Sequence, residues 1–240
     1  IDRYRAIVEM SAGLAHEIRN PLASIRGCAE ELTTDPQILP ENARMLEIIR
    51  NESDRLNNII NDFSNYLKES PPRKEVCSIK TVVEETAALA EQNPSFSSIS
   101  FELDIEDDLS IPLDRDQWTQ VFLNLFLNAS EALAKKIFVS AKRISAENVT
   151  FARQFVSVEE IDYGVELSIS DTGGGIDQDN LSNVFIPFYT TKDKGIGVGL
   201  SIVNRIIRSH GGIIEVRSTG TSGTTFIIIL PVYKKQETVT

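Results

Sequence analysis

Residues 11–22 read Ser-Ala-Gly-Leu-Ala-His-Glu-Ile-Arg-Asn-Pro-Leu, and they belong to a long amphipathic pattern. At about 100° per residue around a helix, the apolar side chains share one stripe: Ile7, Met10, Leu14, Ile18, Ile25, Ala29 and Leu32. His16 falls roughly opposite this stripe, among small side chains. The pattern predicts a helix from residue 3 to about 33, kinked at Pro21, that presents an accessible imidazole. A solvent-facing histidine with no task is the alternative reading of this stretch.

A second apolar stripe follows a predicted turn at residues 33–42, which contains two prolines. Its members are spaced by three, four or seven residues: Met45, Ile49, Leu56, Ile59, Phe63 and Tyr66. Two antiparallel helices cannot enclose a core by themselves, so we expect a homodimer in which two hairpins form a four-helix bundle. Residues 70–73, Ser-Pro-Pro-Arg, indicate a short linker after this unit.

The remainder of the chain alternates between helical and strand patterns. Helices are predicted at 79–91, from the N-cap Asp114 to about Ala134, and at 199–209. Strands are predicted at 99–105, 137–144, 151–157, 163–170, 212–218 and 224–231. We therefore expect a multi-domain chain: an all-α hairpin at 1–70, then an α+β sandwich at 71–240 with helices on one face of a mixed sheet.

Composition narrows the function classes. The net charge of −11 argues against a surface for nucleic acid or for direct contact with an anionic membrane. Cys28 and Cys77 show no metal-ligand spacing and indicate a reduced, cytoplasmic setting. No apolar run reaches the ~18 residues that span a bilayer, and no signal peptide opens the chain. Because residue 1 is Ile, we expect a fragment, from which a membrane anchor or sensing domain could have been removed.

Two motifs carry polar groups suited to a nucleotide. Asn124 and Asn128 lie one turn apart on a predicted helix, and amide oxygens are hard, neutral ligands suited to Mg²⁺. Asp171 ends an apolar strand and begins Asp-Thr-Gly173-Gly-Gly175, where a carboxylate can accept a hydrogen bond from an exocyclic amine such as that of adenine. Taken singly, each motif also has a structural explanation: solvated asparagines, or a simple turn.

Two further motifs are joined. Residues 185–192 read Phe-Ile-Pro-Phe-Tyr-Thr-Thr-Lys, and residues 195–200 read Gly-Ile-Gly-Val-Gly-Leu. Glycines that open a helix offer free backbone N–H groups and a positive dipole end to phosphate, and Lys192 adds a cation. These glycines are Gly195, Gly197 and Gly199. Near the C-terminus, Gly223-Thr-Thr225-Phe is expected to place the Thr225 hydroxyl beside the base.

In this order, the motifs make the chain resemble the transmitter region of a two-component sensor histidine kinase. The segment His16-Glu-Ile-Arg-Asn-Pro is similar to the H box, and the four later motifs are similar to the N, G1, F and G2 boxes. The residues of the His16 motif and of the 185–192 motif are most similar to those of the nitrogen-regulation-like subgroup. The resemblance implies a dimerisation and histidine phosphotransfer hairpin at 1–70 and a catalytic, Bergerat-type ATP-binding domain at 71–240.

The resemblance also implies an activity. ATP would phosphorylate His16, which would pass the phosphoryl group to an aspartate in the receiver domain of a response regulator. Glu17 is the candidate acceptor for the proton on the other ring nitrogen, and Asn20 would act in dephosphorylating the regulator. In the second unit, the implied roles are Mg²⁺ binding, adenine recognition and phosphate contact. Asn128, with Asn124, would bind Mg²⁺. Asp171, with Thr225, would recognise adenine, and Lys192, with the backbone of 195–199, would contact the phosphates.

Two other functions are compatible with the motifs. A Bergerat-type ATPase or protein-serine kinase would make His16 incidental, whereas a degenerate kinase would serve as a dimeric scaffold or nucleotide sensor. Related ATPases carry a glutamate about one turn before the metal asparagine, but Asn124 cannot take a proton, so we expect slow hydrolysis without His16. Glu131 occupies a position that is basic in several subfamilies, which argues against a phosphate contact there.

Overall fold

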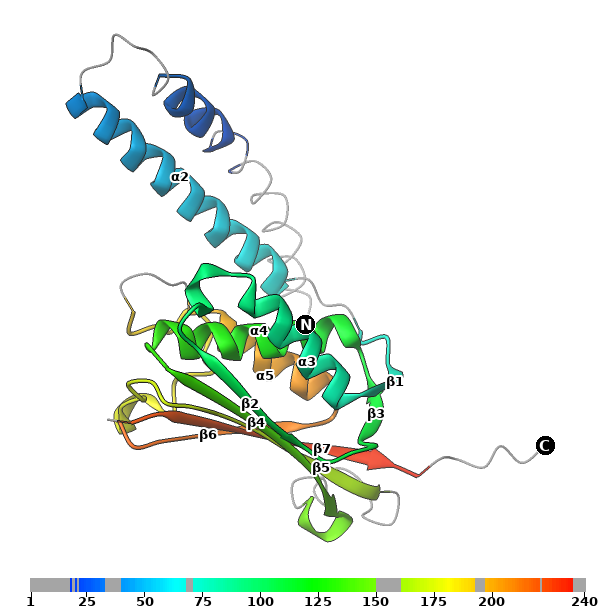
Figure 1. Ribbon diagram of the computed structural model, residues 1–240. Coiled ribbons are helices and arrows are strands. Elements are labelled where there is room, and N and C mark those ends of the chain that lie inside the picture. The colour runs from blue at the N-terminus through cyan, green and yellow to red at the C-terminus, as the bar shows by residue number, and fades with distance from the viewer. Residues whose placement is uncertain are drawn as a thin grey trace. The chain divides into compact units, whose positions relative to one another are not determined.

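A computed structural model of the chain describes residues 18, 20, 22–32, 40–67, 71–149, 161–192, 197–220 and 222–234. The chain divides into two compact units, 1–70 and 71–240, which are described separately below (Figure 1). Within the described ranges, every helix is too short or too polar to cross a membrane.

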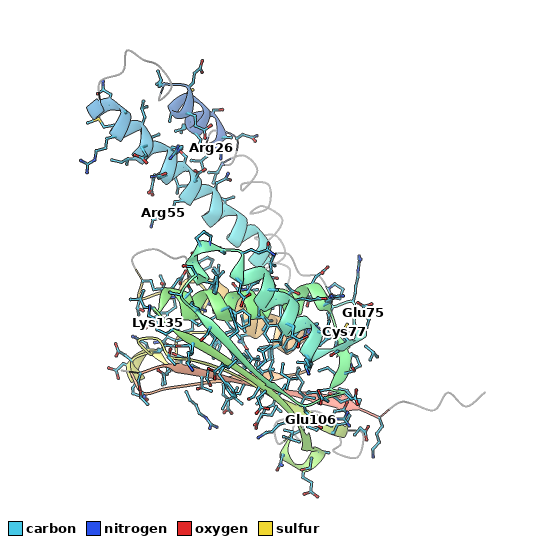
Figure 2. The ribbon with its side chains drawn as sticks, viewed as in Figure 1. Arg26, Arg55, Glu75, Cys77, Glu106 and Lys135 are labelled. Atoms are coloured by element: carbon cyan, nitrogen blue, oxygen red, sulfur yellow. The ribbon has the colours of Figure 1, made fainter. Side chains whose placement is uncertain are left out.

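The first unit contains two antiparallel helices. Residues 22–32 are helical, and α2 (Pro40–Leu67) runs back alongside them. Leu22 packs against Ile60, both 8% exposed. Arg26, which Figure 2 labels on the first helix, has its Nη1 3.2 Å from Asp54 Oδ1. Because residues later in the first helix meet residues earlier in α2, the two helices run in opposite directions. This confirms the predicted helical hairpin.

Part of the hairpin prediction falls on residues outside the described ranges, and part of it is wrong. Most of residues 3–21, including the kink expected at Pro21, lie outside the described residues. The turn predicted at 33–42 is wrong at its end, because α2 begins at Pro40. Proline suits the first position of a helix, since its φ angle is already helical and the missing N–H has no intrahelical partner there.

The hairpin leaves a row of apolar side chains exposed in the single chain. Those with helical spacing, at 39–63% exposure, are Ile18, Ile25, Leu32, Met45, Ile49 and Leu56. On the first helix they recur every seven residues, the spacing of a helix–helix seam. The described residues of one hairpin therefore do not cover this stripe.

The second unit is a sandwich of helices on a sheet. Its five-stranded sheet has the order β2 (Ser100–Ile105), β4 (Lys136–Ser145), β5 (Ile161–Asp171), β7 (Thr224–Tyr233) and β6 (Ile213–Ser218). β2 and β4 are parallel, and the other neighbours are antiparallel. Helices α3 (Ile79–Glu91), α4 (Arg115–Glu131) and α5 (Gly199–Ser209) cover one face (Figure 1). This confirms the predicted mixed α+β sandwich.

The core lies between α4 and the sheet. α4 begins at the predicted N-cap Asp114, whose Oδ1 accepts a hydrogen bond from Gln117 N at 3.1 Å. The buried side chains of α4 are Trp118, Val121, Phe122, Leu125, Phe126 and Ala129. Strand residues such as Ile137, Val139, Leu167 and Ile228 are buried as well. Burial of this face leaves the polar side chains of α4 on its other face.

Two short strands were not predicted. β1 (Glu75–Ser78) and β3 (Ser110–Leu113) pair antiparallel in a separate two-stranded sheet. Four residues are too few to show an alternation that stands out from loop sequence. The strand predicted at 151–157 lies outside the described residues. Single turns of 3₁₀ helix occur at Pro94–Phe96, Ala146–Asn148 and Gln178–Asn180.

A buried histidine joins the start of α4 to the end of α5. His210, 5% exposed, accepts a hydrogen bond at Nε2 from Asp114 N at 3.0 Å, and its Nδ1 lies 2.8 Å from Ile206 O. A carbonyl only accepts, so Nδ1 carries the proton and the ring is neutral. Burial lowers the pKa of His210, and the positive charge of Lys74 lowers it further. The hydrogen bond to the Ile206 carbonyl and the negative charge of Asp114 act in the opposite direction but do not outweigh burial.

This histidine should make the second unit sensitive to acid. A group whose folded pKa is lowered contributes stability that is complete above its unfolded pKa, about 6.5 for histidine, and is lost as pH falls through the folded pKa. Each unit of pKa difference is worth about 1.4 kcal/mol. We expect the free energy of unfolding to decrease as the pH is lowered below about 6.5. The measurement is unfolding monitored by the fluorescence of Trp118, the single tryptophan.

The chain supplies a matched control, because His16 and His210 are its two histidines. His210→Gln should flatten the dependence of Trp118 unfolding on pH between 5 and 7, and His16→Gln should leave it intact. Equal slopes in the wild type and in His210→Gln would contradict the assignment.

Candidate nucleotide-binding site

The polar face of α4 forms one wall of the site. Asn124, Asn128 and Glu131 are spaced by four and three residues, so they share a face of the helix. Asn124 and Asn128 are both half-buried. The apolar face fixes α4 against the sheet, and the two predicted amides therefore stand on a rigid support.

Asp171 lies at the end of β5 and forms the second wall. Its Oδ1 accepts a hydrogen bond from Gly173 N at 2.7 Å, and the backbone N–H of Thr224 also donates to the carboxylate. Burial raises the pKa of Asp171, although these two hydrogen bonds and the positive charge of Lys192 act in the opposite direction. The result is a half-buried carboxylate with accepting capacity left for a ligand donor.

The glycine loop after Asp171 binds to the end of α4. A Cβ on Gly173 would lie 2.7 Å from Ala132 Cβ and 2.8 Å from Ala132 O, so only glycine fits this approach. Gly174 N donates to Ala132 O at 3.0 Å, and Gly175 follows half-buried in the same loop. The predicted Gly173 and Gly175 therefore bring Asp171 and α4 together, and a direct nucleotide contact by either glycine stays a prediction.

The predicted glycines before α5 have different positions. Gly197 has φ +71°, and its carbonyl accepts a hydrogen bond from Phe188 N at 3.0 Å. A Cβ there would lie 2.3 Å from Tyr189 O, which makes glycine necessary. Gly199 is the first residue of α5, and a Cβ on it would lie 3.2 Å from Asn124 Oδ1. Gly195 lies outside the described residues.

The start of α5 therefore lies beside Asn124. Among the described residues no side chain caps this helix end, so its first backbone N–H groups can donate to another acceptor. An uncapped helix start next to an amide face is suited to the phosphates of a nucleotide. The phosphate-binding role expected of residues 195–200 stays a prediction, and residues 195 and 196 lie outside the described residues.

Lys192 reaches back to α4. Its Nζ lies 3.3 Å from Asn128 Oδ1 and 2.5 Å from Glu131 Oε2. Its charge also acts on Asp171, as the pKa of that carboxyl reflects. The structure thus brings Lys192, Asn128 and Asp171 into one site, although they come from three separate segments.

Thr225 is not placed beside Asp171. Its Oγ1 lies 2.9 Å from Ser170 Oγ, and it follows the buried Thr224 along β7. Successive strand side chains point to opposite faces, so Thr225 shares its face with Ser170, whereas Thr224 shares the inward face with Asp171. Thr224, which the sequence interpretation did not single out, is the residue whose backbone N–H donates to the Asp171 carboxylate. The alternation with the buried Phe226, Ile228 and Leu230 was the signal that could have found it.

The predicted residues of the first unit are described only in part. His16 and Glu17 lie outside the described residues. Asn20 is helical and exposed, and its carbonyl accepts a hydrogen bond from Ser24 Oγ at 3.3 Å. An exposed amide on this helix is accessible to another protein, as the predicted role of Asn20 requires.

The donor set of the second unit fits Mg²⁺ bound together with a nucleotide. Among the described residues, no group of three or more His, Cys, Asp or Glu side chains is arranged to hold a metal. The site instead offers the amide oxygens of Asn124 and Asn128, one of which already contacts an ammonium group. Mg²⁺ readily keeps several waters and takes further oxygens from phosphate, so it needs few ligands from the protein. Two amide oxygens are therefore enough for Mg²⁺ bound with a nucleotide, but too few for a metal held by protein side chains alone.

Two family models match parts of the chain. Residues 113–234 match the model of the histidine kinase-, DNA gyrase B- and HSP90-like ATPase family. Residues 6–70 match the His Kinase A (phospho-acceptor) domain.

Relatives match over nearly the whole chain. The sensor histidine kinase ZraS of Escherichia coli K12 is 33% identical over 95% of the chain and 46% of its own length. The sensory histidine kinase/phosphatase NtrB of Rhizobium leguminosarum bv. phaseoli is 32% identical over 96% of the chain and 60% of its own length. The chain thus spans about half the length of such relatives. The structure of the histidine kinase ThkA in complex with the response regulator TrrA has a TM-score of 0.63 at 27% identity, over 98% of this chain and 65% of ThkA.

Proposed function

The chain belongs to the histidine kinases, of which it is a transmitter region, and from this premise we propose that it uses ATP to phosphorylate its own His16. The phosphoryl group then passes to an aspartate of a response regulator. The observation that carries the proposal is the meeting of Asn128, Asp171 and the uncapped start of α5 in one site. The phospho-acceptor match over 6–70, a range that includes His16, supports this residue as the acceptor.

In the proposed mechanism, the second unit binds and orients ATP. The Asp171 carboxylate accepts a hydrogen bond from the exocyclic amine of adenine, with Thr224 on the same inward face of the sheet. The N–H groups at the start of α5 and the Lys192 ammonium contact the phosphates. Asn128, with Asn124, would hold Mg²⁺, which would supply positive charge that offsets the charge of the phosphates.

His16 supplies the nucleophile. The usual pKa of histidine, about 6.5, leaves most of the imidazole neutral at pH 7. One ring nitrogen forms a bond to the γ-phosphorus while the bond from that phosphorus to the β–γ bridging oxygen breaks, and ADP leaves. Glu17 accepts the proton from the other ring nitrogen as positive charge develops. The products are ADP and phosphohistidine.

We further propose that the working form is a homodimer. The exposed stripe of the hairpin repeats every seven residues on the first helix, and the described residues of one chain do not cover it. A second copy would bury both stripes in a four-helix bundle. The free cysteines Cys28 and Cys77 and the need for ATP support a cytoplasmic setting for residues 1–240.

The proposal is tested by the chemistry of the transferred phosphate. The chain is incubated with γ-labelled ATP and Mg²⁺, and the labelled protein is then exposed to acid and to base. A label that is lost in acid and kept in base indicates phosphohistidine. An acid-stable label would favour a protein-serine kinase, and nucleotide binding with neither label nor hydrolysis would favour a scaffold.

Asn20→Ala should separate two activities. If the amide orients water during dephosphorylation of the regulator, its loss should lower phosphatase activity by at least about tenfold and leave autophosphorylation within about twofold. Autophosphorylation is measured on the chain with ATP, and phosphatase activity is measured on the isolated, phosphorylated regulator. Ser24→Ala, at an exposed position one turn further along the helix, is the control. Loss of both activities together would instead make Asn20 a structural support for the helix at Pro21.

A further inference from the structure

The nucleotide site contains an ion pair that the proposed mechanism does not use. Glu131 Oε2 lies 2.5 Å from Lys192 Nζ, with the side chains 51% and 39% exposed. The same Nζ is 3.3 Å from Asn128 Oδ1. A single ammonium group therefore contacts both a carboxylate and an amide of the same helix face.

This position matters because Asn128 Oδ1 is the oxygen proposed for Mg²⁺. A metal ion coordinated by that oxygen would lie within a few ångström of the Lys192 ammonium. Two cations at such a separation repel each other, most strongly where solvent is partly excluded. Lys192 must therefore move away from Asn128 before the metal can bind there.

We infer that Glu131 is a positioning residue that holds Lys192 beside Asn128 in the nucleotide-free site, so that the lysine competes with Mg²⁺ for this amide. On nucleotide binding, Lys192 exchanges Glu131 and Asn128 for phosphate oxygens. This inference rests on the proposed function, because it takes the same site for Mg²⁺ and nucleotide. Its consequence is that Glu131 raises the Mg²⁺ concentration that nucleotide binding requires.

Two simpler roles for Glu131 make different predictions. An ordinary surface ion pair would contribute slightly to folding and nothing to nucleotide binding. A free negative charge would repel the phosphates directly, whether or not Lys192 is present. Only the role in which Glu131 positions Lys192 requires that the effect of Glu131 on Mg²⁺ and nucleotide binding depend on Lys192.

The test is a double-mutant cycle read by ADP binding to the full chain, measured calorimetrically over a series of Mg²⁺ concentrations. Glu131→Gln should lower the Mg²⁺ concentration for half-maximal ADP binding by about two- to fivefold, the range expected for one partly exposed ion pair. In a Lys192→Gln background the same substitution should have no effect. Glu102→Gln is the matched control, since Glu102 is also 51% exposed and lies 2.5 Å from Lys136 Nζ on the β2–β4 edge.

Each other result overturns the inference. An equal effect of Glu131→Gln with and without Lys192 would show direct repulsion of the phosphates. An unchanged Mg²⁺ requirement in Glu131→Gln would show an ordinary surface pair. If the wild type binds ADP normally in either case, the proposed function stands; if the wild type binds no nucleotide at any Mg²⁺ concentration, both fail.

Discussion

His16→Gln should abolish acid-labile phosphorylation, by at least about 10³-fold, because the reaction loses its nucleophile. Glutamine is close to histidine in size and stays uncharged, but its amide nitrogen has no lone pair available for attack on phosphorus. The measurement is the acid-labile label on the protein after incubation with labelled ATP and Mg²⁺.

The same variant should bind nucleotide like the wild type. The residues proposed to bind and orient the nucleotide lie in the unit 71–240, so the Kd for ADP in the presence of Mg²⁺ is the control for intact protein. An acid-labile label that survives in His16→Gln would place the phosphoryl group on another residue, and the proposed mechanism would be wrong.

Asp171→Asn should weaken ADP binding by about 10- to 100-fold, the loss expected for one hydrogen bond to a charged group. The asparagine oxygen can still accept the hydrogen bond from Gly173 N, so the loop should keep its conformation. What is lost is the negative charge, together with an accepting oxygen for the adenine amine, in a site that burial has partly removed from water. Binding is measured by calorimetry at neutral pH.

Glu166→Gln is the matched control for this substitution. Glu166 lies five residues earlier on β5, where it pairs with Lys142 at 2.9 Å, and its loss should leave the Kd unchanged. Equal weakening in the two variants would point to general destabilisation of the strand and would contradict the role of Asp171.

The dependence of ADP binding on pH gives a second measurement on Asp171. Burial raises the pKa of this carboxyl, so the wild type should lose affinity as pH falls towards that value, at a higher pH than an ordinary aspartate would. Asp171→Asn should lack this part of the dependence, because its amide does not titrate. Parallel pH profiles for the two proteins would contradict the assignment.

The elements with strong periodicity could be predicted from the sequence. α5 was predicted at 199–209, the bounds that the structure shows, because its apolar residues recur at helical spacing. The start of α4 was predicted because Asp114 is a strong N-cap. The strands β1 and β3 could not be predicted, since they pair over a separation of more than 30 residues and are only four residues long.

The candidate site was only partly predictable for a similar reason. The motif residues Asn124, Asn128, Asp171 and Lys192 could be named from their types and order. The choice between Thr224 and Thr225 could not be made from the motif alone, because it depends on which face of β7 meets Asp171. One residue of register moves a side chain to the opposite face of a sheet.

Local patterns therefore determined the helices, most strands, the order of the motifs and the chemistry that each motif offers. Those features depend on spacings of two to four residues, which the sequence carries directly. Tertiary structure alone decided that Lys192 lies on Asn128 and Glu131, more than 60 residues away, and that Gly173 packs on Ala132. Such contacts follow from how the sheet and α4 pack together, and that packing depends on the fit of many side chains at once.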